Sequence, residues 1–257
     1  MTSIGEGFLG SLGAGLMTAV GAVPVLFVRR VSESVQHLML AFAAGVMLAA
    51  SFFSLIVPGI DALKAAGAHQ AMAAAGMAMA VLLGAAVIGL INRRFEVSVE
   101  AIGPPDAGRD VQRRLWLFVA AITLHNLPEG MAVGVSFGGD DLQAGLSTAI
   151  GIGVQNLPEG LVTATALMAL GYSRSMGFAG ALASGLVEPV GGLLGVSLVT
   201  MMPVLLPGGL GFAAGAMIYV VTAEMIPETQ RRPEGGRSIA AFMVGLVGMM
   251  FLDVALG

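Results

Sequence analysis

His125–Gly130 reads His-Asn-Leu-Pro-Glu-Gly, and the same pattern recurs at Gln155–Gly160 as Gln-Asn-Leu-Pro-Glu-Gly. The two copies begin 30 residues apart. A helix needs ~20 apolar residues to cross a bilayer, so this offset fits one span and a short turn. Each copy sits inside a long stretch of otherwise apolar residues. The pattern predicts two successive membrane helices that carry the same polar groups in opposite directions.

The composition excludes an ordinary soluble protein. Of the 257 residues, 56% are hydrophobic and only 11% are Asp, Glu, Lys or Arg, against about 25% charged residues in soluble domains. The 38 glycines suit close helix packing in lipid. The absence of Cys excludes disulfides and thiolate metal ligands. A net charge of −4 gives no reason to expect a nucleic-acid partner.

Apolar runs of sufficient length predict an all-α integral membrane protein with eight transmembrane helices. The residues between Arg93 and Arg114 hold Pro104 and Pro105 and predict a cytoplasmic loop over about 93–114. No second domain is evident, so 1–257 is interpreted as one transmembrane domain. The first span lacks the flanks of a cleaved signal peptide and is expected to be retained. The predicted spans are 7–28, 36–58, 71–92, 115–138, 142–169, 175–201, 206–226 and 238–256.

Basic residues predict the orientation. Eleven of the twelve Lys and Arg residues lie on one side of the predicted spans, and only Lys64 lies on the other. The positive-inside rule makes the eleven-residue side cytoplasmic. Both termini are then extracytoplasmic, which requires an even number of spans. The eleven residues are Arg29, Arg30, Arg93, Arg94, Arg109, Arg113, Arg114, Arg174, Arg231, Arg232 and Arg237.

A second internal similarity predicts an inverted repeat. Phe42–Met47 recurs as Phe212–Met217, and on that register Ser54 corresponds to Glu224. The two segments lie in spans of opposite direction, as do the two motif copies. Spans one to three would mirror spans six to eight around a central pair, an inverted 3+2+3 arrangement found in transporters. A coincidence among small apolar residues is the alternative for this shorter match.

Four glutamates lie inside predicted spans: Glu129, Glu159, Glu188 and Glu224. An ionised group at the bilayer centre costs at least ~3 kcal/mol. No Lys or Arg lies within a span to pair with them, so a bound divalent cation is the simplest partner. Two alternatives stay open: kinked helices whose motif side chains bond to each other, and protonated acids that bond between helices.

Spacing places suitable ligands together. His125 and Glu129 are four residues apart and share one helix face, as do Gln155 and Glu159. Each motif Asn lies beside these pairs. Imidazole, carboxylate and amide oxygen are ligands for zinc and similar ions. Two facing helices could therefore hold two ions, with Glu129 and Glu159 bridging them.

Other polar or polarisable residues have plain alternatives. Met47 alone would be interpreted as core filling, and Ser54 as a serine bonded to its own helix. Asp61 is either a solvated residue at the outer end of the second span or part of a metal entrance. Asp253, near the outer end of the last span, has no assigned role.

These residues resemble the signature of the ZIP family of zinc and iron transporters. His125–Gly130 is similar to the fourth-span signature, and Gln155–Gly160 resembles the GufA-like branch. Further similarity lies at Ala41–Met47 (Ala-Phe-Ala-Ala-Gly-Val-Met), Ser184–Pro189 (Ser-Gly-Leu-Val-Glu-Pro) and Ala223–Glu228 (Ala-Glu-Met-Ile-Pro-Glu). The similarity runs in order along nearly the whole chain.

The resemblance implies eight helices, external termini, uptake toward the cytoplasm and a two-metal centre. It implies a first site of Met47, His125, Glu129, Gln155 and Glu159. It implies a second site of Asn126, Glu129, Asn156, Glu159 and Glu188. It also suggests that Ser54, Asp61 and Glu224 line the transport pathway.

Two departures from the family pattern bear on the metal site. Some relatives have Asp where this chain has Asn156, so the second site has one negative charge fewer. Some have His where this chain has Ala223, so the exit has one ligand fewer. The 93–114 segment contains no His, which argues against a His-rich metal-sensing loop.

We therefore expect a transporter, and no enzyme, that moves divalent metal ions into the cytoplasm. Zn²⁺ is the first choice of transported substrate, and Cd²⁺, Fe²⁺, Mn²⁺ and Co²⁺ suit the same ligands; no organic cofactor is expected. A metal-selective channel on the same residues is the nearest alternative. An intramembrane metalloenzyme and a metal sensor are more distant ones. The expected setting is the lipid bilayer of a bacterial inner membrane, and analogy with the family suggests a homodimer.

Overall fold

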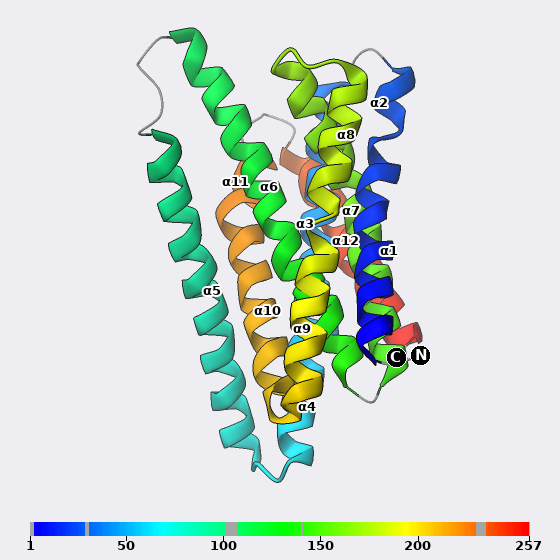
Figure 1. The fold of residues 1–257 in the computed structure, drawn as a ribbon, viewed down its shortest axis with the longest axis vertical. Helices are drawn as coiled ribbons and strands as arrows, with labels where there is room; N and C mark the ends of the chain where they lie inside the picture. The colour runs from blue at the N-terminus through cyan, green and yellow to red at the C-terminus, as the bar shows by residue number, and fades with distance from the viewer. Residues whose placement is uncertain (1–2, 29–30, 101–106, 140, 230–234, 257) are drawn as a thin grey trace.

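The structure is a computed structural model that describes residues 3–28, 31–100, 107–139, 141–229 and 235–256. Within these ranges the regular elements are all helical (Figure 1). Most are α-helices, η2 is a 3-10 turn, and η1 and η3 are π-helical. The elements are α1 (Ser3–Ala22), α2 (Pro24–Phe27), α3 (Glu33–Ala50), η1 (Ser51–Ile56), α4 (Val57–Ala65), α5 (Gln70–Glu100), α6 (Ala107–Gly138), α7 (Leu142–Ala169), α8 (Arg174–Gly185), α9 (Glu188–Met201), η2 (Pro203–Leu205), α10 (Leu206–Val220), η3 (Val221–Met225), α11 (Ile226–Thr229) and α12 (Gly235–Leu256).

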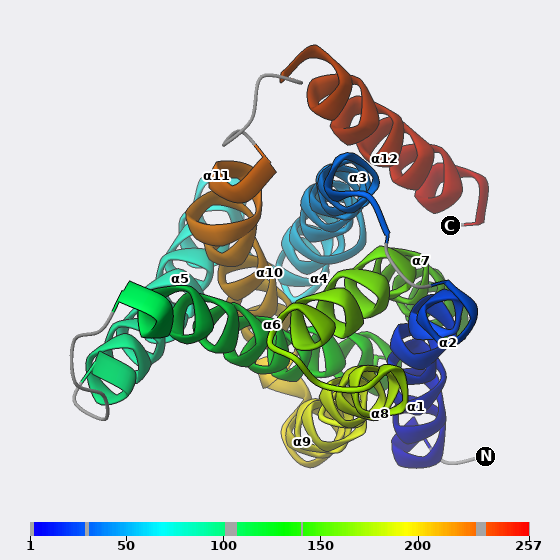
Figure 2. The same cartoon turned by 90° about the horizontal axis from the view of Figure 1, so that it is seen from above.

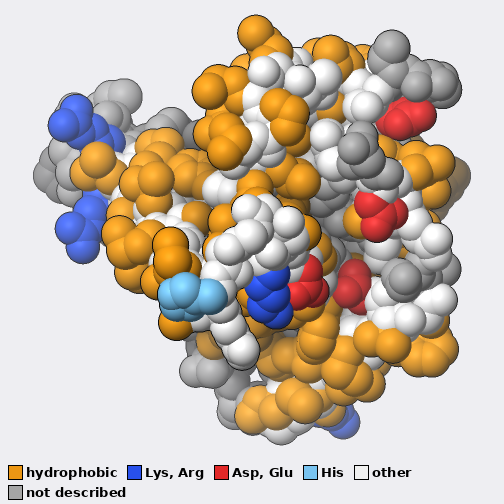
Figure 3. Space-filling view, turned by 90° about the horizontal axis from the view of Figure 1, so that it is seen from below, with side chains coloured by type: hydrophobic (Ala, Val, Ile, Leu, Met, Phe, Trp, Pro, Cys, Tyr) orange, Lys and Arg blue, Asp and Glu red, His pale blue; other side chains and the backbone are white. Residues whose placement is uncertain are grey.

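Six helical stretches among the described residues are long and apolar enough to cross a membrane. Helices α6 and α7, of 32 and 28 residues, are not among the six, and both carry the polar motif. Large apolar side chains such as Leu82, Val244 and Phe251 are exposed, at 62%, 63% and 67%. Figure 3, which views the molecule of Figure 1 from below, shows a mainly hydrophobic surface with few charged side chains. This surface is that of an integral membrane protein.

Local signals set the helix ends. Asp141 caps α7 by accepting hydrogen bonds from the amides of Gln143 and Ala144, at 3.0 and 3.1 Å. Ser32 and Ser173 cap α3 and α8 in the same way. Gly171 follows α7 with a φ of 95°, a left-handed conformation that suits glycine at a helix end. Helix α6 ends and α7 begins at the end of the molecule where α1 begins and α12 ends (Figure 1).

Several helices pack in close pairs, and glycine residues at the contacts let their backbones approach. Helix α12 lies along α3, and α10 lies along α5 (Figure 2). A side chain on Gly45 of α3 would collide with the carbonyl oxygen of Phe242 on α12. A side chain on Gly215 of α10 would collide with the carbonyl oxygen of Val81 on α5. Such contacts are typical of small residues between membrane helices.

Two kinds of irregularity interrupt the helices. The stretch from Arg174 to Met201 breaks between Gly185 and Glu188. Pro189 lacks an amide hydrogen, so the helix cannot continue its bonding through this point. Glu188 thereby starts α9, where a helix end carries partial positive charge. The π-helical turns η1 and η3 hold Ser54 and Glu224, and such turns are common at functional sites.

The predicted loop over 93–114 was too long. Helix α5 continues to Glu100 and α6 begins at Ala107. Charged residues are compatible with helices that extend beyond a membrane, which polarity alone does not reveal. Residues 101–106, with Pro104 and Pro105, lie outside the described residues, as do four arginines used for the orientation: Arg29, Arg30, Arg231 and Arg232.

Candidate metal site

The two motif copies face each other across α6 and α7. Gln155 donates from Nε2 to Oε1 of Glu129 over 2.6 Å, and both side chains are fully buried. Glu159 is 3% exposed. Glu129 interacts electrostatically with both Glu159 and Glu188. Three acidic side chains from α6, α7 and α9 therefore share one buried region.

Asn156 links this region to two further helices. Its Nδ2 donates to Oε1 of Glu188 over 2.7 Å and to the carbonyl oxygen of Ala14 on α1 over 2.8 Å. Asn126, the matching residue on α6, donates from Nδ2 to Oγ of Ser184 over 3.0 Å. Asn126, Asn156 and Glu188 are fully buried. Both amide nitrogens thus donate hydrogen bonds, whereas both amide oxygens lack a hydrogen-bond partner among the described residues.

Several buried oxygen atoms of this group have no hydrogen-bond partner among the described residues. An unsatisfied buried polar group costs about 1–3 kcal/mol, and more if it is charged. Five of the expected ligands each contribute one such oxygen, an atom type that can bind a cation. The atoms are Oδ1 of Asn126, Oε2 of Glu129, Oε1 of Gln155, Oδ1 of Asn156 and Oε2 of Glu188.

The side chain of His125 contacts a fourth glutamate, Glu224, which does not belong to the group of three buried acids described above. Its Nε2 lies 3.1 Å from Oε2 of Glu224 on η3, and Oε1 of Glu224 accepts from Nδ2 of Asn92 over 2.8 Å. His125 is 6% exposed, whereas the side chain of Glu224 is 20% exposed. The sequence singled out His125 and Glu224 but not their contact. Asn92 was missed because it precedes Arg93 at a predicted span end, where a polar residue is ordinary.

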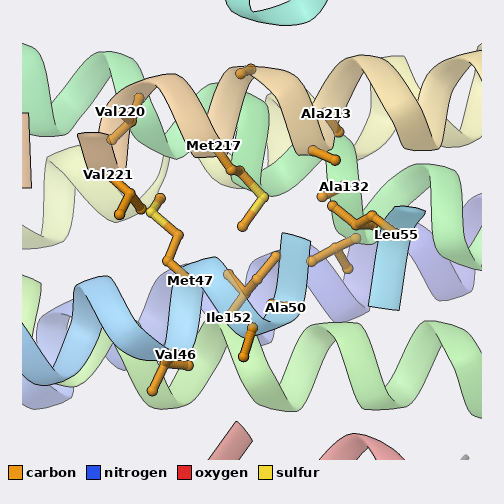
Figure 4. Packing of buried hydrophobic residues seen from close by; sticks show 14 of the residues in the cluster. Val46, Met47, Ala50, Leu55, Ala132, Ile152, Ala213, Met217, Val220 and Val221 are labelled. Carbon is orange, nitrogen blue, oxygen red and sulfur yellow. The ribbon is translucent and has the colours of Figure 1, made fainter. Parts of the chain in front are cut away.

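Met47 lies in the hydrophobic cluster between α3 and α10. It is 1% exposed, and Figure 4 shows its thioether sulfur directed toward Val221. Met217, its counterpart in the short repeat, projects into the same cluster (Figure 4). Among the described residues the Met47 side chain makes no polar contact, so its position fits core packing.

The three expected pathway residues lie apart from one another. Ser54 donates to Oδ1 of Asp253 over 2.6 Å, and the same oxygen accepts from Ser147 over 3.1 Å. Asp61 is exposed and pairs with Lys64 at 3.0 Å. The sequence left Asp253 without a role, because nothing in its spacing reveals that α12 turns it toward η1 and α7.

The side chains that could bind a metal ion here are of several chemical kinds. Among the described residues, no three His, Asp or Glu side chains come together in a way that could hold a metal by themselves. Any ion bound between α6 and α7 would have to take amide oxygens as well. A set of carboxylate and amide oxygens with one imidazole suits divalent ions, since zinc accepts nitrogen and oxygen ligands.

Comparison with known proteins identifies the family. The family model described as ZIP Zinc transporter matches residues 103–253. The chain is 41% identical over 254 residues to "Zinc transporter GufA" of Myxococcus xanthus, covering 99% of this chain and 100% of that protein. This chain is a member of the ZIP family.

Other ZIP relatives are similar over most of their length. "Zinc transporter ZIPB" of Bordetella bronchiseptica is 44% identical over 258 residues, covering 99% of this chain and 82% of that protein. Human "Zinc transporter ZIP11" is 32% identical over 337 residues, covering 100% of this chain and 98% of that protein. These ZIP relatives are named as transporters and not as enzymes.

Proposed function

We propose that this ZIP protein moves divalent metal ions, zinc first, across the membrane into the cytoplasm. The observation that carries the proposal is the set of unpartnered buried oxygens on Asn126, Glu129, Gln155, Asn156 and Glu188. Burial without a partner is costly for each, and one kind of ligand, a cation, suits all five. The similarity to proteins named as zinc transporters supports zinc as the substrate.

We place two ions between α6 and α7, bridged by Glu129 and Glu159. The first would lie near Gln155, His125 and Met47. The second would lie near Asn126, Asn156 and Glu188, and would draw mainly on oxygen ligands. Ser54 and Asp61 would line the approach from outside, and Glu224 the route inward. The mutual repulsion of the three buried acids supports this assignment, because a divalent cation compensates it.

The proposal includes eight spans in one domain, arranged as an inverted repeat. Support comes from features 170 residues apart in the chain: the crossing glycines Gly45 and Gly215, and the π-helical turns that start at Ser51 and Val221. In the proposed mechanism one group of helices moves against the other to expose the site on alternate sides. The homodimer stays an expectation by analogy.

Zinc flux tests the function directly. The purified protein is sealed in liposomes that contain a zinc-sensitive dye, and the substitution Glu159→Ala is measured in parallel. We expect saturable zinc entry by the wild type and its loss in Glu159→Ala. Glu33→Ala, which removes a carboxylate at the start of α3, is the matched control and should transport like the wild type. Zinc that binds tightly but never crosses would favour a sensor, and flux that does not saturate would favour a channel.

The absence of Cys gives a clean test of orientation. Ala66 is exposed in the α4–α5 turn, and Gly236 is exposed at the start of α12. In intact cells, a membrane-impermeant maleimide should label Ala66→Cys and not Gly236→Cys. Permeabilised cells should label both. The reverse pattern in intact cells would overturn the proposed direction of uptake.

A further inference from the structure

Seven buried side-chain atoms have no hydrogen-bond partner among the described residues, and five of them belong to expected ligands. The remaining two are the hydroxyls of Thr18 and Thr163. We propose that Thr18 is a further residue of the metal site, whose hydroxyl oxygen faces the second ion from the α1 side. This inference rests on the proposed function and adds a residue that neither the motif nor the family resemblance supplied.

The hydroxyl of Thr18 differs from other buried hydroxyls in these helices. Ser11, Ser51 and Thr148 each donate to the carbonyl oxygen four residues earlier, over 2.8, 2.8 and 2.9 Å. For Thr18 that carbonyl belongs to Ala14, and it accepts the amide of Asn156 instead. The Thr18 side chain is 1% exposed, so bulk water does not satisfy its hydroxyl.

The position of this hydroxyl points to the metal site. A side chain built on Gly185, the last residue of α8, would come within 2.9 Å of Oγ1 of Thr18. Ser184, the neighbour of Gly185, accepts the hydrogen bond from Asn126. Glu188 begins α9 just after this break. The hydroxyl therefore lies at the helix break that also presents a partner of Asn126 and the carboxylate of Glu188.

The packing of α1 against α7 repeats that of α9 against α6. The carbonyl oxygen of Thr18 lies against Gly160, the last motif residue of α7, and the carbonyl oxygen of Glu188 lies against Gly130, the last motif residue of α6. One turn further, Gly21 meets the carbonyl of Leu157. In the same way, Gly191 meets the carbonyl of Leu127. Thr18 is thus the counterpart of Glu188 in the other half.

The correspondence with Glu188 suggests what Thr18 would contribute to the site. Glu188 supplies a carboxylate from α9, and Thr18 supplies a neutral oxygen from α1. Neutral hydroxyl and amide oxygens, together with a carboxylate, form an oxygen-rich set that suits divalent cations without thiolate ligands. Thr18 would then raise the affinity of the second site while adding no negative charge.

The test is zinc binding by purified full-length protein, measured by equilibrium dialysis with metal analysis. Thr18→Val keeps the shape and removes the hydroxyl, and Thr18→Ser keeps the hydroxyl. Thr165→Val is the matched control, because the Thr165 hydroxyl donates to the carbonyl of Val162 in its own helix over 2.9 Å. We expect Thr18→Val to lower the zinc affinity of the proposed second site about 10-fold, as loss of a supporting ligand does. Thr18→Ser and Thr165→Val should bind like the wild type.

Two results would overturn the inference and leave the proposed function intact. In the first, Thr18→Val binds zinc like the wild type while Glu159→Ala has lost flux. In the second, Thr18→Val and Thr18→Ser both lose affinity together with a lower unfolding temperature, which would indicate a packing role. A wild type that neither binds nor transports zinc would overturn the proposed function itself, and this inference with it.

Discussion

The two copies of Asn-Leu-Pro-Glu-Gly have the same sequence, but their side chains contact different residues. On α7, Asn156 donates to an acid, Glu188, and to a backbone carbonyl. On α6, Asn126 donates to a hydroxyl, that of Ser184. The residue before each copy differs as well: His125 contacts Glu224, whereas Gln155 bonds to Glu129. A duplicated motif therefore gives two unequal half-sites, and the helices packed behind it make the difference.

The largest expected effect on stability comes from adding a side chain to the glycine that ends either motif copy, where a backbone carbonyl packs closely. In Gly130→Ala and Gly160→Ala the new methyl group meets a backbone carbonyl, of Glu188 and Thr18 respectively. Overpacking costs about 1–3 kcal/mol and sometimes more, and a backbone cannot rotate away as a side chain can. We expect both variants to unfold at clearly lower temperature in detergent, by similar amounts.

Gly13→Ala is the control for these two variants. Apart from the adjoining backbone of its own helix, no atom lies within 4 Å of the position of its new methyl group, and alanine is favoured over glycine in a helix by about 0.5–1 kcal/mol. The variant should be as stable as the wild type or more so. A loss confined to one of Gly130→Ala and Gly160→Ala would contradict the equivalent packing of the two copies.

Asn156→Asp tests how much the stability of the protein depends on the hydrogen bonds of the α7 motif copy. The substitution removes the donor to Glu188 and to the Ala14 carbonyl and places a second acid beside Glu188. Without zinc we expect a loss of about 1–3 kcal/mol in the free energy of unfolding, since buried acceptors lose their partner. Zinc should restore more stability than in the wild type, because the added charge binds the cation. Thermal unfolding with and without zinc measures both effects.

Asn126→Asp provides the matched comparison. Its partner is the hydroxyl of Ser184, which can turn and donate to the new carboxylate. The zinc-free loss should therefore be smaller than for Asn156→Asp. Equal losses at the two positions would mean that the neighbours of the two copies are not what distinguishes them.

His125→Gln makes the two hexapeptides identical. The variant loses an imidazole that suits zinc, while Glu224 keeps its hydrogen bond from Asn92. We expect the zinc concentration for half-maximal flux to rise about 10-fold, a typical effect of losing a supporting ligand. The preference for zinc over manganese should also fall, because manganese favours oxygen ligands. Unchanged selectivity would separate His125 from the metal pathway.

The smallest effect is expected far from both copies. Asp61 and Lys64 form an ion pair at 3.0 Å with side chains 64% and 45% exposed, and exposed pairs contribute roughly 0–1 kcal/mol. Asp61→Asn should leave stability nearly unchanged. If Asp61 attracts ions to the entrance, zinc flux should fall about two-fold at low salt and recover at high salt, where charges are screened. An equal loss at both salt concentrations would argue against this role.

The sequence predicts best what depends on one helix alone. Helix α7 covers the predicted 142–169, and the i, i+4 spacing correctly places Gln155 and Glu159 in the same buried region. Contacts between helices depend on how each helix is rotated, which spacing does not encode. Asp253 therefore had no assigned role, although it accepts hydrogen bonds from Ser54 and Ser147. The break before Glu188 was likewise hidden inside one apolar run.

Zinc-edge anomalous scattering from crystals grown with zinc would locate any bound ion directly. We predict zinc between α6 and α7, with carboxylate oxygens of Glu129 and Glu159 at the ~2.0–2.2 Å expected for zinc–oxygen bonds. A second peak should lie near Asn156 and Glu188. Ordered crystals in which zinc occupies only surface positions, with none between the two motif copies, would contradict a metal site between α6 and α7.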